Sequence, residues 1–111
     1  MSEEIDENNL AMLKDLLGDK FDELVDTFLQ DSRQRYKAMQ VGLDNGDINE
    51  LRHQVHGLKG SCRNIGVNPL ADLCQILETQ AEEGTLKNEL QQMAAIEQKL
   101  AVVSELLKKS V

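Results

Sequence analysis

The sequence is poor in aromatic residues. Phe, Tyr and Trp together make up 3% of its 111 residues, and Trp is absent. Proteins that bind single-stranded nucleic acid stack the bases on such side chains. The net charge of -8 at pH 7 also opposes attraction to nucleic acid or to an anionic membrane. We therefore expect the partners of this chain to be proteins, with no nucleic acid and no membrane among them.

Long hydrophobic runs are missing as well. No apolar stretch approaches the roughly 20 residues that a membrane-spanning helix needs, and the opening segment MSEEIDENN is acidic where a signal peptide is basic. We expect a cytoplasmic location. Cysteine is scarce, and a chain of this length can form a core without disulfides. We therefore expect Cys62 and Cys74 to be buried and reduced.

A single proline and the lack of alternating apolar and polar runs leave no basis for β-strands. The expected helices cover about residues 5–17, Asp19 to residues 44–47, Asp47 to Gly66, Asn68 to Gly84, and Thr85 onward, with Asp19, Asp47 and Thr85 as caps. Short connections make neighbouring helices antiparallel. The predicted fold is all-α: an up-and-down four-helix bundle with an additional short N-terminal helix, formed by residues 1–111 as one domain.

The segment VHGLKGSCRNIG, residues 55–66, has two glycines inside a helical pattern. Each glycine in a helix interior costs about 0.5–1 kcal/mol relative to Ala. A helical projection places one apolar stripe on the core side: Leu51, Val55, Leu58, Cys62 and Ile65. His56 points away from it, within about 60° of a polar group: Asn49, Arg52, His53, Lys59, Gly60 and Arg63. No acid occurs between Glu50 and Asp72, so we expect His56 to lie exposed among cations.

Ordinary roles for His56 fit this pattern less well. A hydrogen-bonded core histidine is the common case, but the projection turns His56 away from the core. A merely solvated charged face leaves the acid-free window of an acidic chain unexplained. Zinc bound by His53 and His56 would need further Cys, His or carboxylate ligands, and this face has cations instead. A Ser/His/Asp arrangement lacks a carboxylate on this helix face to orient the imidazole.

An exposed imidazole beside a cation fits phosphoryl transfer, in which the protein mainly positions the reactants and stabilises charge. Lys59, one turn after His56, can reach a phosphoryl oxygen, whereas a nearby carboxylate would repel the incoming group. Gly60 lets another protein approach the ring, and Gly57 clears the adjacent flank. The sequence has no GxxxxGK[ST] or GxGxxG motif. We therefore expect a carrier without a nucleotide site or turnover of its own, with proteins as donor and acceptor.

These residues also carry a family resemblance. His56-Gly-Leu-Lys59-Gly60-Ser61, followed by Gly66 and Leu70, resembles the H-x-L-K-G-S-x-x-x-x-G-x-x-x-L signature of histidine-containing phosphotransfer (HPt) domains. The resemblance implies a four-helix bundle whose histidine takes a phosphoryl group from an aspartate of one receiver domain and passes it to an aspartate of another. His56 would be the phosphoacceptor, Lys59 would stabilise the phosphoryl charge, and Gly60 would permit docking.

The same resemblance implies the partners. They are response-regulator receiver domains and a hybrid sensor histidine kinase, with Mg²⁺ on the receiver and no cofactor on this chain. We expect a monomer, and the initial Met and acidic N-terminus favour a free-standing protein over a piece of a kinase. His53 matches no family position and is a bystander. Cys62 and Arg63 stand where many relatives have small residues, which bears on the receivers that fit.

The first expected helix has more hydrophobic residues than one face needs: Leu10, Met12, Leu13, Leu16 and Leu17. We expect some of them, represented by Met12 and Leu13, to form an exposed docking patch beside His56, with Arg52 and Arg63 as a charged rim. The alternative is that all of them seal the end of the bundle.

Two other functions stay open for the chain as a whole. One is a helical binding module that sequesters a receiver domain or kinase without being phosphorylated, and such a module has no need of His56 and Lys59. The other is a structural bundle, which leaves the two glycines unexplained.

Overall fold

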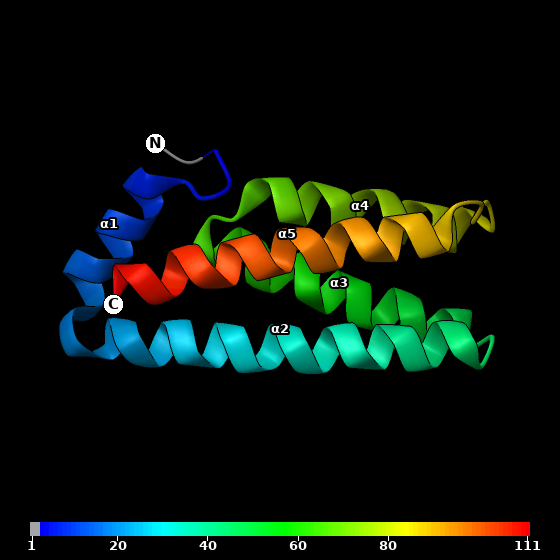
Figure 1. Ribbon diagram of the computed structural model, residues 1–111, viewed down its shortest axis with the longest axis horizontal. Coiled ribbons are helices and arrows are strands. Elements are labelled where there is room, and N and C mark those ends of the chain that lie inside the picture. The colour runs from blue at the N-terminus through cyan, green and yellow to red at the C-terminus, as the bar shows by residue number, and fades with distance from the viewer. Residues whose placement is uncertain (1–2) are drawn as a thin grey trace.

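The computed structural model describes residues 3–111, and within that range every regular element is helical. The elements follow the chain in a simple order (Figure 1). They are α1 Glu7–Leu17, the 3-10 helix η1 Gly18–Lys20, α2 Phe21–Asp44, α3 Ile48–Ile65, α4 Asn68–Glu83 and α5 Glu89–Ser110. Between residues 3 and 111, no helix is long and apolar enough to cross a membrane.

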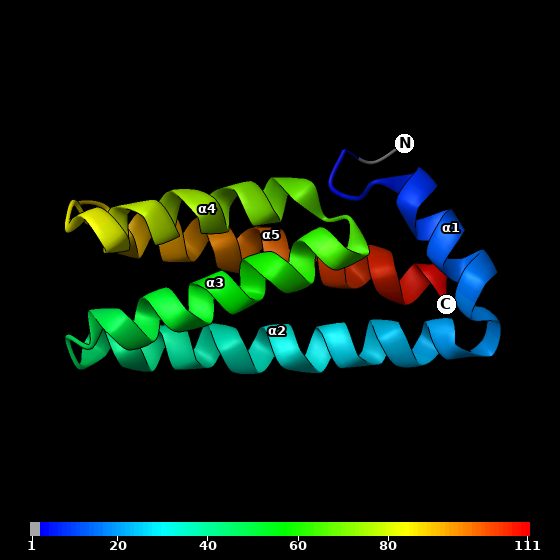
Figure 2. The same cartoon turned by 180° about the vertical axis from the view of Figure 1, so that it is seen from behind.

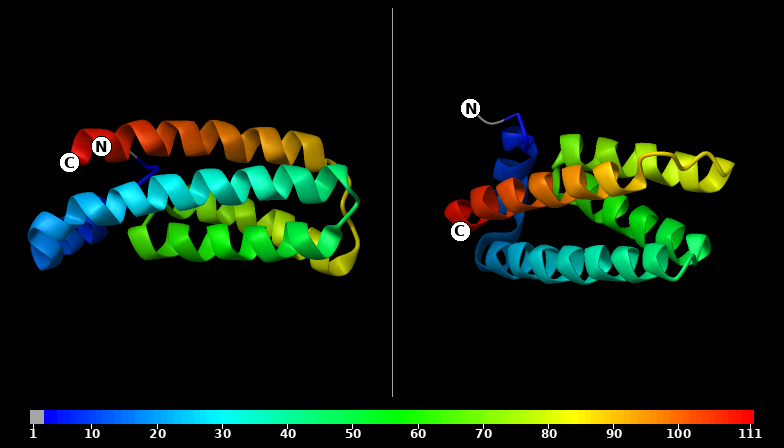
Figure 3. Two further views of the ribbon diagram at one scale, coloured as in Figure 1. Left: turned by 90° about the horizontal axis from the view of Figure 1, so that it is seen from below. Right: turned by 45° about the vertical axis from the view of Figure 1, so that its right-hand side comes forward.

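The four long helices α2, α3, α4 and α5 run up and down alongside one another, and α1 lies across one end of the bundle (Figures 1 and 3). α3 runs obliquely between α2 and α4 and packs against both (Figure 2). The C-terminal end of α5 reaches α1, where Lys14 Nζ donates a 2.8 Å hydrogen bond to the carbonyl of Ser110. The predicted all-α bundle with a short N-terminal helix is confirmed.

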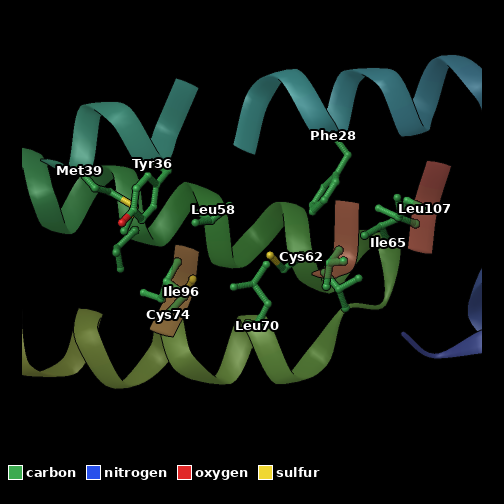
Figure 4. Close-up of a cluster of buried hydrophobic side chains, with 14 of the residues drawn as sticks. Phe28, Tyr36, Met39, Leu58, Cys62, Ile65, Leu70, Cys74, Ile96 and Leu107 are labelled. Atoms are coloured by element: carbon green, nitrogen blue, oxygen red, sulfur yellow. The ribbon is translucent and has the colours of Figure 1, made fainter. Parts of the chain in front are cut away.

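One cluster of mostly aliphatic side chains fills the bundle (Figure 4). The predicted stripe of α3 is buried throughout: Leu51, Val55, Leu58, Cys62 and Ile65. Cys62 and Cys74 are free and buried, as expected. Burial raises the pKa of the Cys74 thiol to about 12 and also raises the pKa of Cys62. Both thiols are therefore protonated and unreactive near neutral pH.

The predicted helix caps hold in one place and fail in two. Asp47 caps α3, since its side chain accepts a hydrogen bond from the backbone N–H three residues on. The expectation that Asp19 caps α2 is wrong, because Asp19 lies inside η1 and Lys20 precedes α2 without a side-chain cap. Thr85 does not cap α5 either, because a loop intervenes and the helix begins at Glu89.

Candidate functional site

His56 lies near the middle of α3, on the face opposite the core. Its side chain is 68% exposed, whereas its neighbour Val55 is fully buried. Most of the predicted polar group is exposed too: Asn49, Arg52, His53, Gly60 and Arg63. Lys59 is the exception, with 19% of its side chain exposed. This contrast follows from the helical period, which separates adjacent residues by about 100°. The predicted orientation of His56 is confirmed.

A carboxylate that the sequence analysis did not find holds the imidazole. Glu78 of α4 is 5% exposed, and its Oε2 lies 2.7 Å from Nδ1 of His56. The expectation that no carboxylate orients the ring is wrong, because it considered one helix face and the acid comes from the neighbouring helix. One signal was available: Glu78 occupies a position in the apolar period of α4, together with Leu70, Cys74, Leu77 and Ala81.

Lys59 shares this carboxylate with His56. Its Nζ lies 2.6 Å from Oε1 of Glu78 and donates a 3.0 Å hydrogen bond to Oε1 of Gln75. Burial raises the pKa of Glu78, but the hydrogen bonds from Lys59 and His56 outweigh it, so the net pKa lies below its usual value. Glu78 is therefore ionised near neutral pH, with Oε2 hydrogen-bonded to His56 and Oε1 ion-paired with Lys59. A carboxylate beside the ring was expected to repel an incoming phosphoryl group, and the positive charge of Lys59 counters the negative charge of Glu78.

The hydrogen bond to Glu78 selects one tautomer of the imidazole. An ionised carboxylate has no proton to donate, so Nδ1 of His56 carries the hydrogen of this bond. In the neutral ring the lone pair then lies on Nε2, the other ring nitrogen. The site thus combines an exposed ring, a fixed proton on one nitrogen and a nucleophilic lone pair on the other.

The two glycines beside His56 differ in their surroundings. A Cβ atom at Gly60 would meet nothing within 4 Å, so this position leaves open space over the helix. A Cβ atom at Gly57 would collide with the guanidinium of Arg35, a residue of α2 in the same chain. The expectation that Gly57 clears a flank for a partner is therefore wrong. Gly57 makes room for Arg35, whereas the space beside Gly60 is open.

The two basic residues expected at the rim of the docking patch differ in their contacts. Arg63 Nη2 lies 3.0 Å from Oδ1 of Asp72, and both side chains are largely exposed. Arg52 is exposed and lines a shallow pocket together with His53, His56, Glu78 and Glu82. In the part of the chain from residue 3 onward, no three His, Cys, Asp or Glu side chains gather in a way that could hold a metal ion.

The hydrophobic residues of α1 are divided between core and surface. Leu10, Leu13 and Leu17 pack against the core cluster, which fits the expectation that they seal the bundle end. Met12 and Leu16 have exposed fractions of 53% and 74%. Met12 and Leu16 are therefore the exposed large hydrophobic residues of α1, whereas Leu13 is partly buried against the core.

The chain is similar to one protein family and to a solved structure. The family model described as Hpt domain matches residues 23–106. The crystal structure of histidine-containing phosphotransfer protein B (HptB) from Pseudomonas aeruginosa PAO1 matches with a TM-score of 0.95 and 33% sequence identity. That match covers 99% of this chain and 96% of the other.

A second similarity is to part of a much longer protein. The signal transduction histidine-protein kinase BarA of Escherichia coli K12 is 34% identical over 77 residues. The match covers 69% of this chain and 8% of the kinase. This chain therefore corresponds to a small segment of the kinase.

Proposed function

The chain belongs to the family of Hpt domains, and from this premise we propose that His56 is the residue that carries its phosphoryl group. As a member of the family it is a phosphorelay carrier, and its partners belong to two-component signalling. One observation carries the assignment of His56. Its ring is 68% exposed while its Nδ1 is held 2.7 Å from the buried carboxylate of Glu78.

The proposed reaction is an in-line transfer between two proteins. The Nε2 lone pair of His56 attacks the phosphorus of an aspartyl phosphate on a receiver domain. The P–O bond to the aspartate breaks, and the carboxylate leaves with the electron pair. The proton on Nδ1 stays between the ring and Glu78, so no proton has to be removed during the step. The reverse sequence returns the phosphoryl group to the aspartate of a second receiver.

Glu78 and Lys59 support this reaction from one side of the ring. Glu78 fixes the tautomer and orientation of His56 through a 2.7 Å hydrogen bond, which keeps Nε2 available for attack. Lys59 neutralises Glu78 at 2.6 Å and brings positive charge near the phosphoryl oxygens. Such charge stabilises a transition state in which negative charge is spread over three oxygens.

The partners follow from the same proposal. The donor and acceptor are response-regulator receiver domains, supplied upstream by a hybrid sensor histidine kinase. The receiver holds Mg²⁺, and this chain binds neither nucleotide nor cofactor and acts as a cytoplasmic monomer. Gly60 gives the receiver access to the ring, and the exposed apolar surface of Met12 and Leu16 offers a docking contact beyond it.

A binding module without phosphorylation is the alternative. Such a module would not need a fixed tautomer of His56. Burial of the acid Glu78 would then destabilise the chain without serving a function. The His56–Glu78–Lys59 arrangement therefore favours transfer over sequestration.

The test is transfer from phosphorylated receiver domains to the chain. We expect label on the wild type and on His53→Gln, and none on His56→Gln. Circular dichroism should show the same helix content for all three, because both histidines lie outside the core. Label on His56→Gln at the wild-type level, or its loss in His53→Gln alone, would contradict the assignment.

A further inference from the structure

Arg52 differs from the other two cations on the face of His56. Lys59 is bound to Glu78 at 2.6 Å, and Arg63 is bound to Asp72 at 3.0 Å. Among residues 3–111, no ion pair and no side-chain hydrogen bond involves Arg52. The donors of its guanidinium are therefore not engaged by another side chain of the described residues.

Arg52 and Lys59 lie on opposite sides of His56 along α3, because Arg52 precedes it by about one turn and Lys59 follows it by about one turn. Side chains on an α-helix tilt toward its N-terminus, so His56 leans over the turn that precedes it. Arg52 lies in that turn, and the two side chains line the same pocket with His53, Glu78 and Glu82. A group bonded to the exposed ring nitrogen therefore lies within the reach of Arg52.

The carboxylates around this pocket favour an additional cation when a phosphoryl group is bound. α4 contributes two carboxylates, Glu78 and Glu82. Lys59 neutralises Glu78, whereas Glu82 has no counterion among the described residues. A doubly negative phosphoryl group would meet this uncompensated charge unless a further cation took part. Arg52 is the pocket residue with a permanent positive charge.

We propose that Arg52 binds the phosphoryl oxygens on His56, which makes it a second phosphoryl-binding cation beside Lys59. The inference rests on the proposed function, because it requires phosphorylation of His56. A guanidinium fork can donate to two phosphoryl oxygens at once, a geometry that an ammonium group does not offer. Arg52 and Lys59 then contact the phosphoryl group from opposite directions along α3.

A small-molecule donor separates phosphoryl binding from receiver docking. With phosphoramidate in its form protonated on nitrogen, Nε2 of His56 forms the bond to phosphorus, the P–N bond breaks, and neutral ammonia leaves with the electron pair. No receiver is present, so a contact between Arg52 and an acidic residue of a partner cannot contribute. The variants are Arg52→Gln, Arg52→Lys and the charge-matched control Arg33→Gln at an exposed arginine of α2, and circular dichroism checks that each remains folded.

Two quantities are measured on the intact chain: the labelling rate, and the ³¹P chemical shift of phosphohistidine as a function of pH. Arg52→Gln should slow labelling about three- to tenfold, as expected for loss of a charge-assisted hydrogen bond. It should also raise the pH midpoint of the ³¹P titration, because a nearby cation favours the dianion. Arg52→Lys should lie between wild type and Arg52→Gln, and Arg33→Gln should follow the wild type.

The outcomes distinguish this inference from the function on which it rests. If the wild type is labelled on His56 and Arg52→Gln matches Arg33→Gln in both quantities, the inference is wrong while the proposed function stands. Slow transfer from receivers alone, with normal labelling by phosphoramidate, would make Arg52 a docking residue and also overturn it. A folded wild type that takes label from neither phosphoramidate nor phosphorylated receivers would overturn both.

Discussion

The guanidinium of Arg35 occupies the space that a side chain at residue 57 would fill, so that α2 and α3 meet closely beside His56. Arg35 Nε donates to Oδ2 of Asp31 at 3.0 Å, and its Nη1 donates to Oε1 of Gln54 at 3.2 Å. Gly57 thus serves contact within the chain. The end of the Arg35 side chain packs where a side chain at residue 57 would lie, and its hydrogen bond to Gln54 links α2 to α3 near His56.

The close contact predicts an energetic coupling between Gly57 and Arg35. In the Arg35→Ala background, Gly57→Ala should stabilise the protein by about 0.5–1 kcal/mol, because Ala is the better helix former. In the wild type that gain should largely disappear, because the new methyl group displaces Arg35 from its hydrogen bonds. The double-mutant cycle, measured by urea unfolding, should give a coupling energy of about 1 kcal/mol. Additive effects would show that the two residues do not compete for space.

Glu78 should make the stability of the protein depend on pH in the acid range. Its hydrogen bonds from Lys59 and His56 lower its pKa below the ordinary 4.5 in the folded state. A depressed folded-state pKa adds stability that is present above pH 4.5 and is lost as the pH falls through the folded value. Between pH 6 and about pH 3, wild type should therefore lose more unfolding free energy than Glu78→Gln.

Glu83→Gln is the control for this pH dependence, because Glu83 is an exposed acid near the end of the same helix. It should keep the wild-type slope of unfolding free energy against pH. Equal slopes for wild type and Glu78→Gln would mean that Lys59 and His56 do not lower the pKa of Glu78 in the folded protein.

Gly60→Leu should separate transfer from stability. A side chain here meets no neighbour within 4 Å, so the protein should become more stable by about 0.5–1 kcal/mol from helix propensity alone. Transfer from a receiver should slow strongly, because the leucine covers the approach to His56. Thermal melting and the transfer rate check the two effects. A stabilised variant that transfers at the wild-type rate would show that access does not depend on Gly60.

The exposed apolar side chains of α1 provide a test of the docking surface. Met12→Ala should weaken receiver binding several-fold with little change in melting temperature, since the side chain is 53% exposed. Leu13→Ala should instead lower the melting temperature, because Leu13 packs against the core. Titration calorimetry and thermal melting measure the two effects. Unchanged receiver affinity for Met12→Ala would remove α1 from the interface.

The sequence was sufficient to predict the helices, the buried stripe of α3 and the exposure of His56. Those features depend on local periodicity and on breaks such as Gly84, which ends α4 in the left-handed conformation with φ 69°. Helix caps were less predictable. Asp19 and Thr85 have suitable side chains, but the chain forms a 3-10 turn at one and a loop at the other.

The partners of His56 and Gly57 were out of reach of a single-helix projection. Glu78 lies 22 residues from His56 in the sequence, and Arg35 approaches Gly57 from another helix. Both contacts depend on how far α2 and α4 are rotated about their axes and shifted along α3. An acid within the apolar period of α4 was the one local sign that Glu78 is buried with a partner.

The most direct test of the account is the protonation and bonding state of the two ring nitrogens of His56. Long-range ¹H–¹⁵N correlation NMR on the chain, before and after phosphorylation, assigns both nitrogens. We predict that neutral His56 carries its proton on Nδ1, toward Glu78, and that phosphorus bonds to Nε2 in the phosphorylated protein. Phosphorus on Nδ1 of His56, or on either nitrogen of His53, would contradict the account.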